Sequence, residues 1–385
     1  MQQTVTSEQF IGDITRVLSE GSANSTMKWL LLLALVDAAP LLLEDDSEIA
    51  LGPVADAAFG LLRPQLRPHP QTGTPLSQDP HPGMEHRLLR IMQEDRGAVP
   101  SEGTRAKIAW HLTQWPVPRL QRIGGETISL LWTTPKSWDE WFTERTAAGK
   151  GTNKALPRRL FDVGHGRLPT LEALPGAIKS LVRLGPLIRP AIELRWSDQV
   201  SRMNRQVSDP QASLRHFLFP TADRFRFSIS LRNDLAHLQR GRCFWCGRSI
   251  EQVENVEVDH VVPWSISHND AIENLVLTCA GCNSIKSNWL PSPQACSIWL
   301  EHLNKNSSRL VELATRHGLR SARVMSISWM RALYVTVPSA TEWRAFHPAG
   351  KAPSILVLDP AAATGYFDAI RETMLKCPSE TSARM

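Results

Sequence analysis

Apolar and polar positions along most of the chain follow the pattern of helices rather than strands. Residues 29–43 are apolar almost throughout but contain Asp37 and Pro40, and they are too few to cross a bilayer. They predict a buried helix, for which Ser25 and Thr26 are the candidate N-terminal caps. Further helices are expected over residues 53–62, 85–95, 102–113, 196–207, 230–238, 294–304 and 307–317.

A few segments depart from this helical pattern. Prolines and glycines crowd residues 64–83, which predicts a loop or linker. Residues 256–258 alternate as in a short strand that leads into Asp259 and His260, and residues 354–358 also favour a strand. Residues 326–337 form a mixed apolar segment. A last helix is expected from residue 360, followed by a polar, disordered tail.

Four of the six cysteines form two Cys-x-x-Cys pairs, Cys243 with Cys246 and Cys279 with Cys282. A pair at this spacing can occupy two corners of a tetrahedral Zn²⁺ site, and a second pair can supply the other two. Four thiolates leave no open position on the ion, so the predicted zinc is structural. The alternative is four buried free thiols in a cytosolic protein.

Two residues near the cysteine pairs offer oxygen rather than sulfur as a metal ligand. Asp259 lies between the two pairs and Asn283 directly follows Cys282, and both offer the oxygen donors that Mg²⁺ or Mn²⁺ prefers. Catalysis is therefore expected at an oxygen-ligated ion rather than at the zinc.

Residues 243–290 resemble the HNH nuclease module, also called the ββα-metal or His-Me finger fold. The resemblance rests on the two cysteine pairs, on the Asp259-His260 dipeptide, on Asn274 and on Asn283 after the last cysteine. It covers about fifty of the 385 residues. The gap between the pairs is longer than in a simple zinc ribbon, as the family expects, because the catalytic hairpin is inserted there.

The roles of individual residues follow from this resemblance and from their chemistry. His260 is the candidate general base, because a neutral imidazole can take a proton from water near neutral pH. Asp259 and Asn283 are the candidate ligands of the Mg²⁺-type ion. By resemblance, Asn274 holds the catalytic loop through backbone hydrogen bonds and so orients His260. Lys286 shares a helical face with Asn283 and is expected to contact a phosphate as a mobile charge.

These parts predict metal-dependent hydrolysis of DNA phosphodiester bonds. The arrangement of the whole chain looks like a bacterial restriction or anti-phage defence endonuclease. Two alternatives stay open. One is a zinc-stabilised DNA-binding protein without catalysis, and the other is an HNH ribonuclease or toxin.

Charge agrees with a polyanionic partner, since the formal net charge is +5. Residues 145–205 contain twelve Lys or Arg against four acidic residues. This excess predicts a DNA-binding surface with Arg158 and Arg159, although a solvated basic face or a flexible connection has the same composition. Arg240 and Arg242, just before the first cysteine pair, either contact the DNA backbone or form a solvated helix face.

The predicted fold class is a mainly α multidomain protein with a small inserted, zinc-stabilised ββα-metal module. We expect four regions: a helical domain at residues 1–135 that is either a DNA reader or a scaffold, a basic region at 136–235, the HNH module at 236–292 and a mainly helical region at 293–385. Six cysteines indicate no disulfide framework, and residues 1–5 lack the features of a signal peptide, so a cytoplasmic location is expected, with no membrane partner. DNA is the expected partner, and a second copy of the chain or accessory defence proteins are further candidates.

Overall fold

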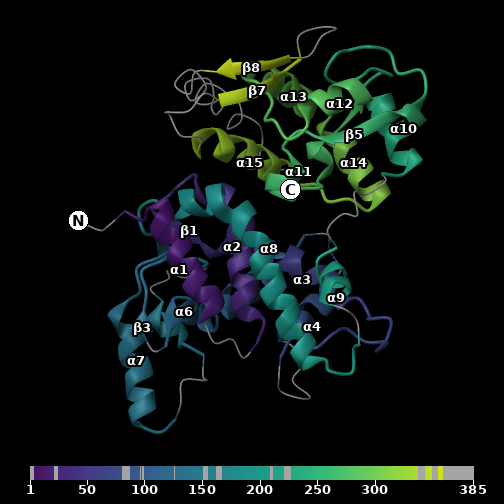
Figure 1. Ribbon diagram of the computed structural model, residues 1–385. Coiled ribbons are helices and arrows are strands. Elements are labelled where there is room, and N and C mark those ends of the chain that lie inside the picture. Colours follow the sequence, from purple (N-terminus) through teal and green to yellow (C-terminus); the bar gives the residue numbers. More distant parts are fainter. Residues whose placement is uncertain are drawn as a thin grey trace. The chain divides into compact units, whose positions relative to one another are not determined.

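The computed structural model describes residues 4–20, 25–79, 87–95, 97, 99–124, 126–150, 155–161, 167–208, 211–220, 227–336, 343–348 and 354–358. These residues are mostly helical, and the chain divides into two compact units, Met1–Asp223 and Arg224–Met385 (Figure 1). The prediction of a mainly helical protein with one small ββα region is confirmed. The finer division into four regions stays a prediction.

The N-terminal unit consists of helices with short strand pairs between them. Strand β1 pairs antiparallel with β4, and β2 pairs antiparallel with β3. In chain order the elements are α1 (Ser7–Ser19), α2 (Met27–Leu42), β1 (Glu48–Ala50), α3 (Leu51–Leu62), the 3₁₀ helix η1 (Arg63–Leu66), α4 (Arg87–Glu94), α5 (Glu102–Gln114), α6 (Val117–Leu120), β2 (Arg122–Ile123), β3 (Glu126–Thr127), α7 (Lys136–Ala147), η2 (Arg158–Leu160), β4 (Thr170–Glu172), α8 (Ala177–Met203) and α9 (Gln211–Leu218).

Helix α2 is the centre of this unit. It is apolar on every side and nearly all of its residues are buried, as the composition of residues 29–43 predicted. Helices α3 and α8 pack against it, and Figure 1 shows α2 and α8 side by side. Gly185 of α8 permits this close approach, because a β-carbon there would lie 2.8 Å from Cγ1 of Val36.

Helix α8 is longer than the sequence indicated. The clearest helix expected in this region began at residue 196, whereas the structure has one helix from Ala177 to Met203 with Pro186 and Pro190 inside it. Pro190 is exposed and Pro186 is half-buried, so water can reach the helix beside both rings. The helix persists because its other face is packed against α2 and α9.

A buried ion network joins α8 to its neighbours and uses part of the basic stretch. The Arg189 guanidinium pairs with Asp37 of α2 and lies 3.4 Å from Glu193, which accepts at 2.6 Å from Arg215 of α9. Arg189 is buried, and Lys179 lies 3.4 Å from Asp46. Arg189 of the basic stretch 145–205 is therefore used inside the fold and does not contribute to a basic surface.

The proline-rich stretch is described over residues 64–79, where its first residues belong to η1 and residues 67–79 form a loop packed onto the N-terminal unit. His69, Leu76 and Gln78 are buried there. The Trp196 indole N–H donates to Gln78 at 2.8 Å, and the Gln78 amide donates to Gln65 at 3.0 Å. These bonds tie the loop to α8 and η1, so this part of the stretch is not a free linker.

The C-terminal unit contains a short antiparallel hairpin with helices packed against it. Strand β5 pairs with β6 in the register Val256 with Cys279 and His260 with Leu275. A second antiparallel pair is formed by β7 and β8. The elements are α10 (Ile229–Leu238), η3 (Val253–Asn255), β5 (Val256–His260), α11 (Trp264–Ser267), η4 (Ile272–Asn274), β6 (Leu275–Cys279), α12 (Ala280–Lys286), α13 (Pro293–Lys305), α14 (Ser307–His317), α15 (Arg323–Thr336), β7 (Trp343–His347) and β8 (Ser354–Leu358).

Most predicted elements of this unit are present. The helix expected at 307–317 and the strand at 354–358 are confirmed, and the mixed segment at 326–337 is helix α15. The helix and tail predicted from residue 360 lie outside the described residues. Among the described residues, no helix combines the length and the apolar character needed to cross a bilayer.

Candidate functional site

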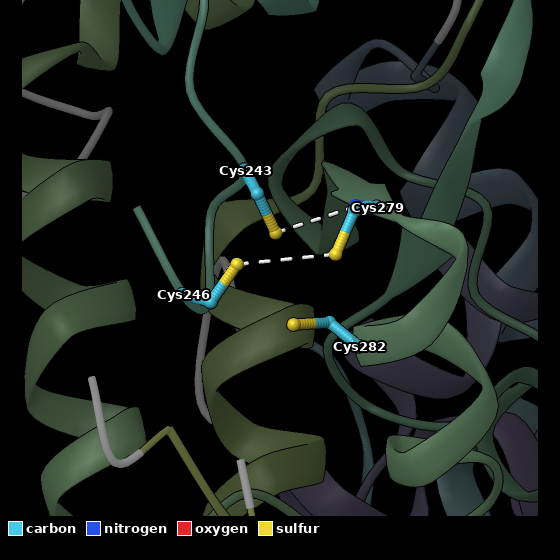
Figure 2. Close-up of side chains that lie close together, drawn as sticks. All are labelled: Cys243, Cys246, Cys279 and Cys282. Atoms are coloured by element: carbon cyan, nitrogen blue, oxygen red, sulfur yellow. Dashed lines mark hydrogen bonds between the residues drawn. The ribbon is translucent and has the colours of Figure 1, made fainter. Parts of the chain in front are cut away.

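The four paired cysteines lie together at one end of the hairpin (Figure 2). Cys243 and Cys246 are in the loop after α10, Cys279 ends β6 and Cys282 is in α12. Their sulfur atoms all lie within 4.8 Å of one another. The structure therefore brings together the two pairs that the sequence assigned to one ion.

The spacing of the sulfurs fits a four-thiolate zinc site. With Zn–S bonds of about 2.3 Å, the sulfurs of a tetrahedron are about 3.8 Å apart, and Sγ of Cys246 lies 3.8 Å from Sγ of Cys279. Burial raises the pKa of the Cys243 and Cys282 thiols, so both are uncharged without an ion nearby. A bound cation stabilises the thiolate form and removes this cost.

The loop that carries the first pair is a tight turn fixed by backbone bonds. The Gly247 N–H donates to the Cys243 carbonyl at 3.0 Å, and the Cys243 N–H donates to the Arg248 carbonyl at 2.9 Å. Gly247 has a φ of 68°, which glycine adopts without a steric cost. The Arg242 guanidinium donates to the Gly247 carbonyl at 3.0 Å and so holds the same turn.

The hairpin and α12 form the ββα region that positions the remaining residues. Strand β5 ends on Asp259 and His260, whose side chains point to opposite faces because the residues are adjacent in a strand. Strand β6 leads through Cys279 directly into α12, which packs against both strands. The cysteine cluster, through Cys279 and Cys282, thus fixes the start of α12 at the end of β6.

Asp259 lies on the inner face of β5 and is 7 % exposed. Its Oδ2 accepts a hydrogen bond from the Trp245 indole N–H at 3.1 Å, and its Oδ1 accepts from Nζ of Lys286 at 3.2 Å. Both carboxylate oxygens therefore have a donor. Each keeps a second lone pair that a metal ion could use.

Lys286 is not the mobile surface charge that the sequence suggested. Its side chain is completely buried, and Nζ donates to Asp259 and, at 2.6 Å, to the carbonyl of His260. The difference arises because α12 turns this face toward β5, where an ammonium group needs a carboxylate partner. Its predicted phosphate contact stays a prediction.

His260 lies on the opposite face and keeps 18 % of its side chain exposed. Its Nε2 is 2.8 Å from Oδ1 of Asp270, and Oδ2 of Asp270 accepts from the Trp264 indole N–H at 3.2 Å. The Phe227 ring lies 5.9 Å from the imidazole, centroid to centroid. Asp270 does not stand out in the sequence, because an Asn-Asp step in a polar segment is also the ordinary signal of a turn.

Asn274 closes the loop between the two strands and is completely buried. Its Oδ1 accepts from the Val262 N–H at 2.7 Å, and its Nδ2 donates to the carbonyls of Val262 at 3.0 Å and of Asn269 at 2.9 Å. These are backbone contacts of the kind that the resemblance implied. Their effect on His260 during a reaction is a proposal.

Asn283 lies in α12, three residues before Lys286, and is partly exposed. Within the part of the chain that the structure describes, its side-chain amide has no hydrogen-bond partner. A carboxylate on β5 and a carboxamide on the helix packed against it are the hard oxygen donors that suit Mg²⁺ or Mn²⁺. The donor types at Asp259 and Asn283 thus fit such an ion, with Lys286 beside them as a competing cation.

The predicted DNA-binding arginines are divided between the two units. Arg240 and Arg242 are exposed between α10 and the first cysteine pair. Arg158 and Arg159 are exposed in η2 of the N-terminal unit, where the Arg158 guanidinium stacks over Trp110 at 4.5 Å from the ring centroid. Each remains accessible to a phosphate backbone.

Comparison with known proteins gives one finding. Residues 243–292 match the family model described as HNH endonuclease. Neither the curated proteins nor the solved structures include a match to this chain. The matched range starts at the first cysteine of the cluster, spans both strands and α12, and includes Asp259, His260, Asn274 and Asn283. Residues 243–292 are therefore an HNH endonuclease domain with a four-cysteine cluster.

Proposed function

We propose that the protein is a metal-dependent endonuclease that hydrolyses DNA phosphodiester bonds, with His260 as the general base. The observation that carries this proposal is the His260 ring, which lies partly exposed at the end of β5 inside the matched HNH endonuclease domain. One ring nitrogen has a carboxylate partner at 2.8 Å, and the other is available to water.

Each residue of the site has a proposed task. The imidazole of His260 takes a proton from water as the water attacks the phosphorus atom. Asn274 keeps the loop after β5 in place through its three backbone bonds. Lys286 fixes the carbonyl of His260 and the Asp259 carboxylate, so both residues at the strand end are held by one buried ammonium group.

Asp259 and Asn283 are the residues that would hold a Mg²⁺ or Mn²⁺ ion. Such an ion supplies neutralisation of the scissile phosphate and of the charge on the leaving oxygen. By the family resemblance, the products carry a 5′ phosphate and a 3′ hydroxyl. The four cysteines would hold Zn²⁺, whose closed coordination leaves it a structural role.

The direct test is cleavage of plasmid DNA by purified full-length protein with Mg²⁺ or Mn²⁺. His260→Ala should abolish cutting while DNA binding and zinc content stay unchanged. His237→Ala is the matched control, because His237 is an exposed histidine of α10 in the same unit. Sequencing the product ends would report end chemistry and site preference together.

The outcomes separate the rival functions. DNA binding without cutting by the wild-type protein, under any divalent ion, would favour a zinc-stabilised DNA-binding protein. Cleavage of matched RNA but not of DNA would favour a ribonuclease or toxin. Loss of cutting in both histidine variants would indicate a folding defect and remove the support for His260.

We also propose that the protein acts in the cytoplasm in restriction or anti-phage defence. The support is the combination of a nuclease domain with a large separate helical unit, which is a candidate reader of DNA. Phage plating on cells that express the wild-type protein should fall relative to cells that express His260→Ala. Equal plating efficiencies across unrelated phages would count against the defence role.

DNA contacts by Arg158, Arg159, Arg240 and Arg242 complete the proposal. Replacing an exposed phosphate-binding arginine should weaken binding and lower its salt dependence without changing the cleaved sequence. Because one active site cuts one strand, a double-strand break requires two binding events or a homodimer. Accessory defence proteins are the other candidate partners.

A further inference from the structure

Each carboxylate oxygen of Asp270 has its own hydrogen-bond partner, and one of these partners is His260. Oδ1 of Asp270 meets Nε2 of His260 at 2.8 Å, while Oδ2 accepts from Trp264 at 3.2 Å. The carboxylate therefore lies between an imidazole and an indole, with one oxygen assigned to each. An exposed loop carboxylate without such contacts would sample several rotamers, whereas this one has a single arrangement that satisfies both partners.

The backbone beside Asp270 is also fixed. The side chain of Asn269 accepts from the Ala271 N–H at 3.0 Å and donates to Oγ of Ser326 at 2.8 Å. The Asn274 amide donates to the Asn269 carbonyl at 2.9 Å. Asp270 is thus held at the base of the loop that Asn274 closes, and its position relative to β5 is defined.

The chemistry of a carboxylate decides which ring nitrogen carries the proton. A carboxylate only accepts hydrogen bonds, so the imidazole must donate through Nε2–H. The neutral ring then has its lone pair on Nδ1, and only that nitrogen can accept a proton from water. The Lys286 bond to the His260 carbonyl holds the backbone from which the ring extends.

We infer that Asp270 is a positioning residue that fixes His260 in the Nε2–H tautomer and in the ring orientation that presents Nδ1 to the attacking water. Asp270 itself does not touch the substrate in this assignment. The inference rests on the proposed role of His260 as general base. It assigns a task to a residue that otherwise has the appearance of a turn residue.

The principal variant is Asp270→Asn. The carboxamide keeps the shape of the side chain and can turn its NH₂ toward the ring, in which case Nε2 must accept and Nδ1 carries the proton. We expect kcat for DNA cleavage to fall by between about 10-fold and about 10⁴-fold, while KM and zinc content stay as in the wild type. Asp270→Glu keeps the acceptor and should recover part of the rate.

A second variant and a spectroscopic measurement guard against loss of fold. Trp264→Phe removes the indole N–H from Oδ2 but keeps a ring, so it should lower kcat in the same direction by a smaller factor. Nitrogen-15 NMR of full-length protein with labelled histidine reports the tautomer of each ring, and His260→Ala identifies the relevant signal. The wild type should show the Nε2–H form, and Asp270→Asn should show a larger fraction of the Nδ1–H form.

The tautomer of His260 and the kcat for DNA cleavage test separate claims. An unchanged tautomer together with unchanged kcat in Asp270→Asn would overturn the inference even if the wild-type protein cuts DNA. A tautomer that depends on Asp270 in a protein that cuts no nucleic acid would support the pairing and reject the proposed function instead. A fall in kcat with an unchanged tautomer would assign Asp270 a merely structural role and would also overturn the inference.

Discussion

Replacing Lys286 with methionine tests whether the buried pair with Asp259 holds the ββα region together. The side chains are 0 % and 7 % exposed, and Nζ lies 3.2 Å from Oδ1. Methionine has a similar length and can fill the same volume. It leaves the Asp259 carboxylate buried with only the Trp245 N–H as a donor, and it leaves the His260 carbonyl without its bond from Nζ.

The expected cost follows from charge and burial. At an effective dielectric constant of about 20, two unit charges 3.2 Å apart attract by about 5 kcal/mol. Desolvation of both groups offsets much of this attraction in the native protein, but removing one partner leaves the other uncompensated and costs about 3–5 kcal/mol. The domain therefore loses a large share of a typical stability of about 5–15 kcal/mol.

A double variant separates charge from packing. Asp259→Asn in the Lys286→Met background removes the uncompensated carboxylate, and asparagine can still accept from Trp245. The lost bond to the His260 carbonyl is common to the single and the double variant, so it cancels in their comparison. We expect the double variant to be more stable than Lys286→Met by about 2 kcal/mol or more.

Hydrogen exchange of the β5 and β6 amides in the zinc-loaded, full-length protein measures this effect. It reports the opening free energy of the hairpin itself, whereas a global melting curve mixes the two units. A cost below about 1 kcal/mol for Lys286→Met, or a double variant no more stable than the single one, would refute the buried-pair reasoning, because the measured cost of breaking such pairs is larger.

Three further predictions address other parts of the molecule. Chelation of zinc, or Cys282→Ser, should expose the C-terminal unit to proteolysis and leave the N-terminal unit intact, because binding of a structural zinc contributes roughly 10–16 kcal/mol to folding. An unchanged digestion pattern would contradict this structural role of the zinc. Burial lowers the pKa of His302 to about 4. The unfolded state therefore binds more protons between pH 4 and 6.5, and the free energy of unfolding falls as pH drops through that window, by up to about 3 kcal/mol. His302→Leu should lessen this loss in urea unfolding measured at each pH. Gly185→Ala should cost about 1–3 kcal/mol by overpacking against Val36; hydrogen exchange of the α2 and α8 amides measures this cost, and an unchanged opening free energy would contradict it.

The sequence was most informative where chemistry depends on residue type and local spacing. Two Cys-x-x-Cys pairs can serve one tetrahedral ion wherever the chain folds, so the cluster of Cys243, Cys246, Cys279 and Cys282 was predictable without a structure. Strand β5 was predictable because its alternation is local. Helix α2 was predictable because a segment that is apolar on all sides has to be buried.

Tertiary structure decided what depends on partners distant in the chain. Helix α8 continues through Pro186 and Pro190 because its packing against α2 and α9 outweighs the local cost of each proline. Arg189 lies in a basic stretch of sequence, but Asp37 and Glu193 use its charge inside the fold.

The same distinction applies within the site. The order of residues placed Asp259, His260, Asn274 and Asn283 in one domain, since the HNH pattern is a pattern of spacing. The burial of Lys286 against Asp259 and the pairing of Asp270 with His260 were not visible in the sequence. Lysine and aspartate side chains are both usual on a solvated surface, so residue type alone identifies no partner. The packing of α12 on β5 and the loop closed by Asn274 determine which carboxylate meets which nitrogen.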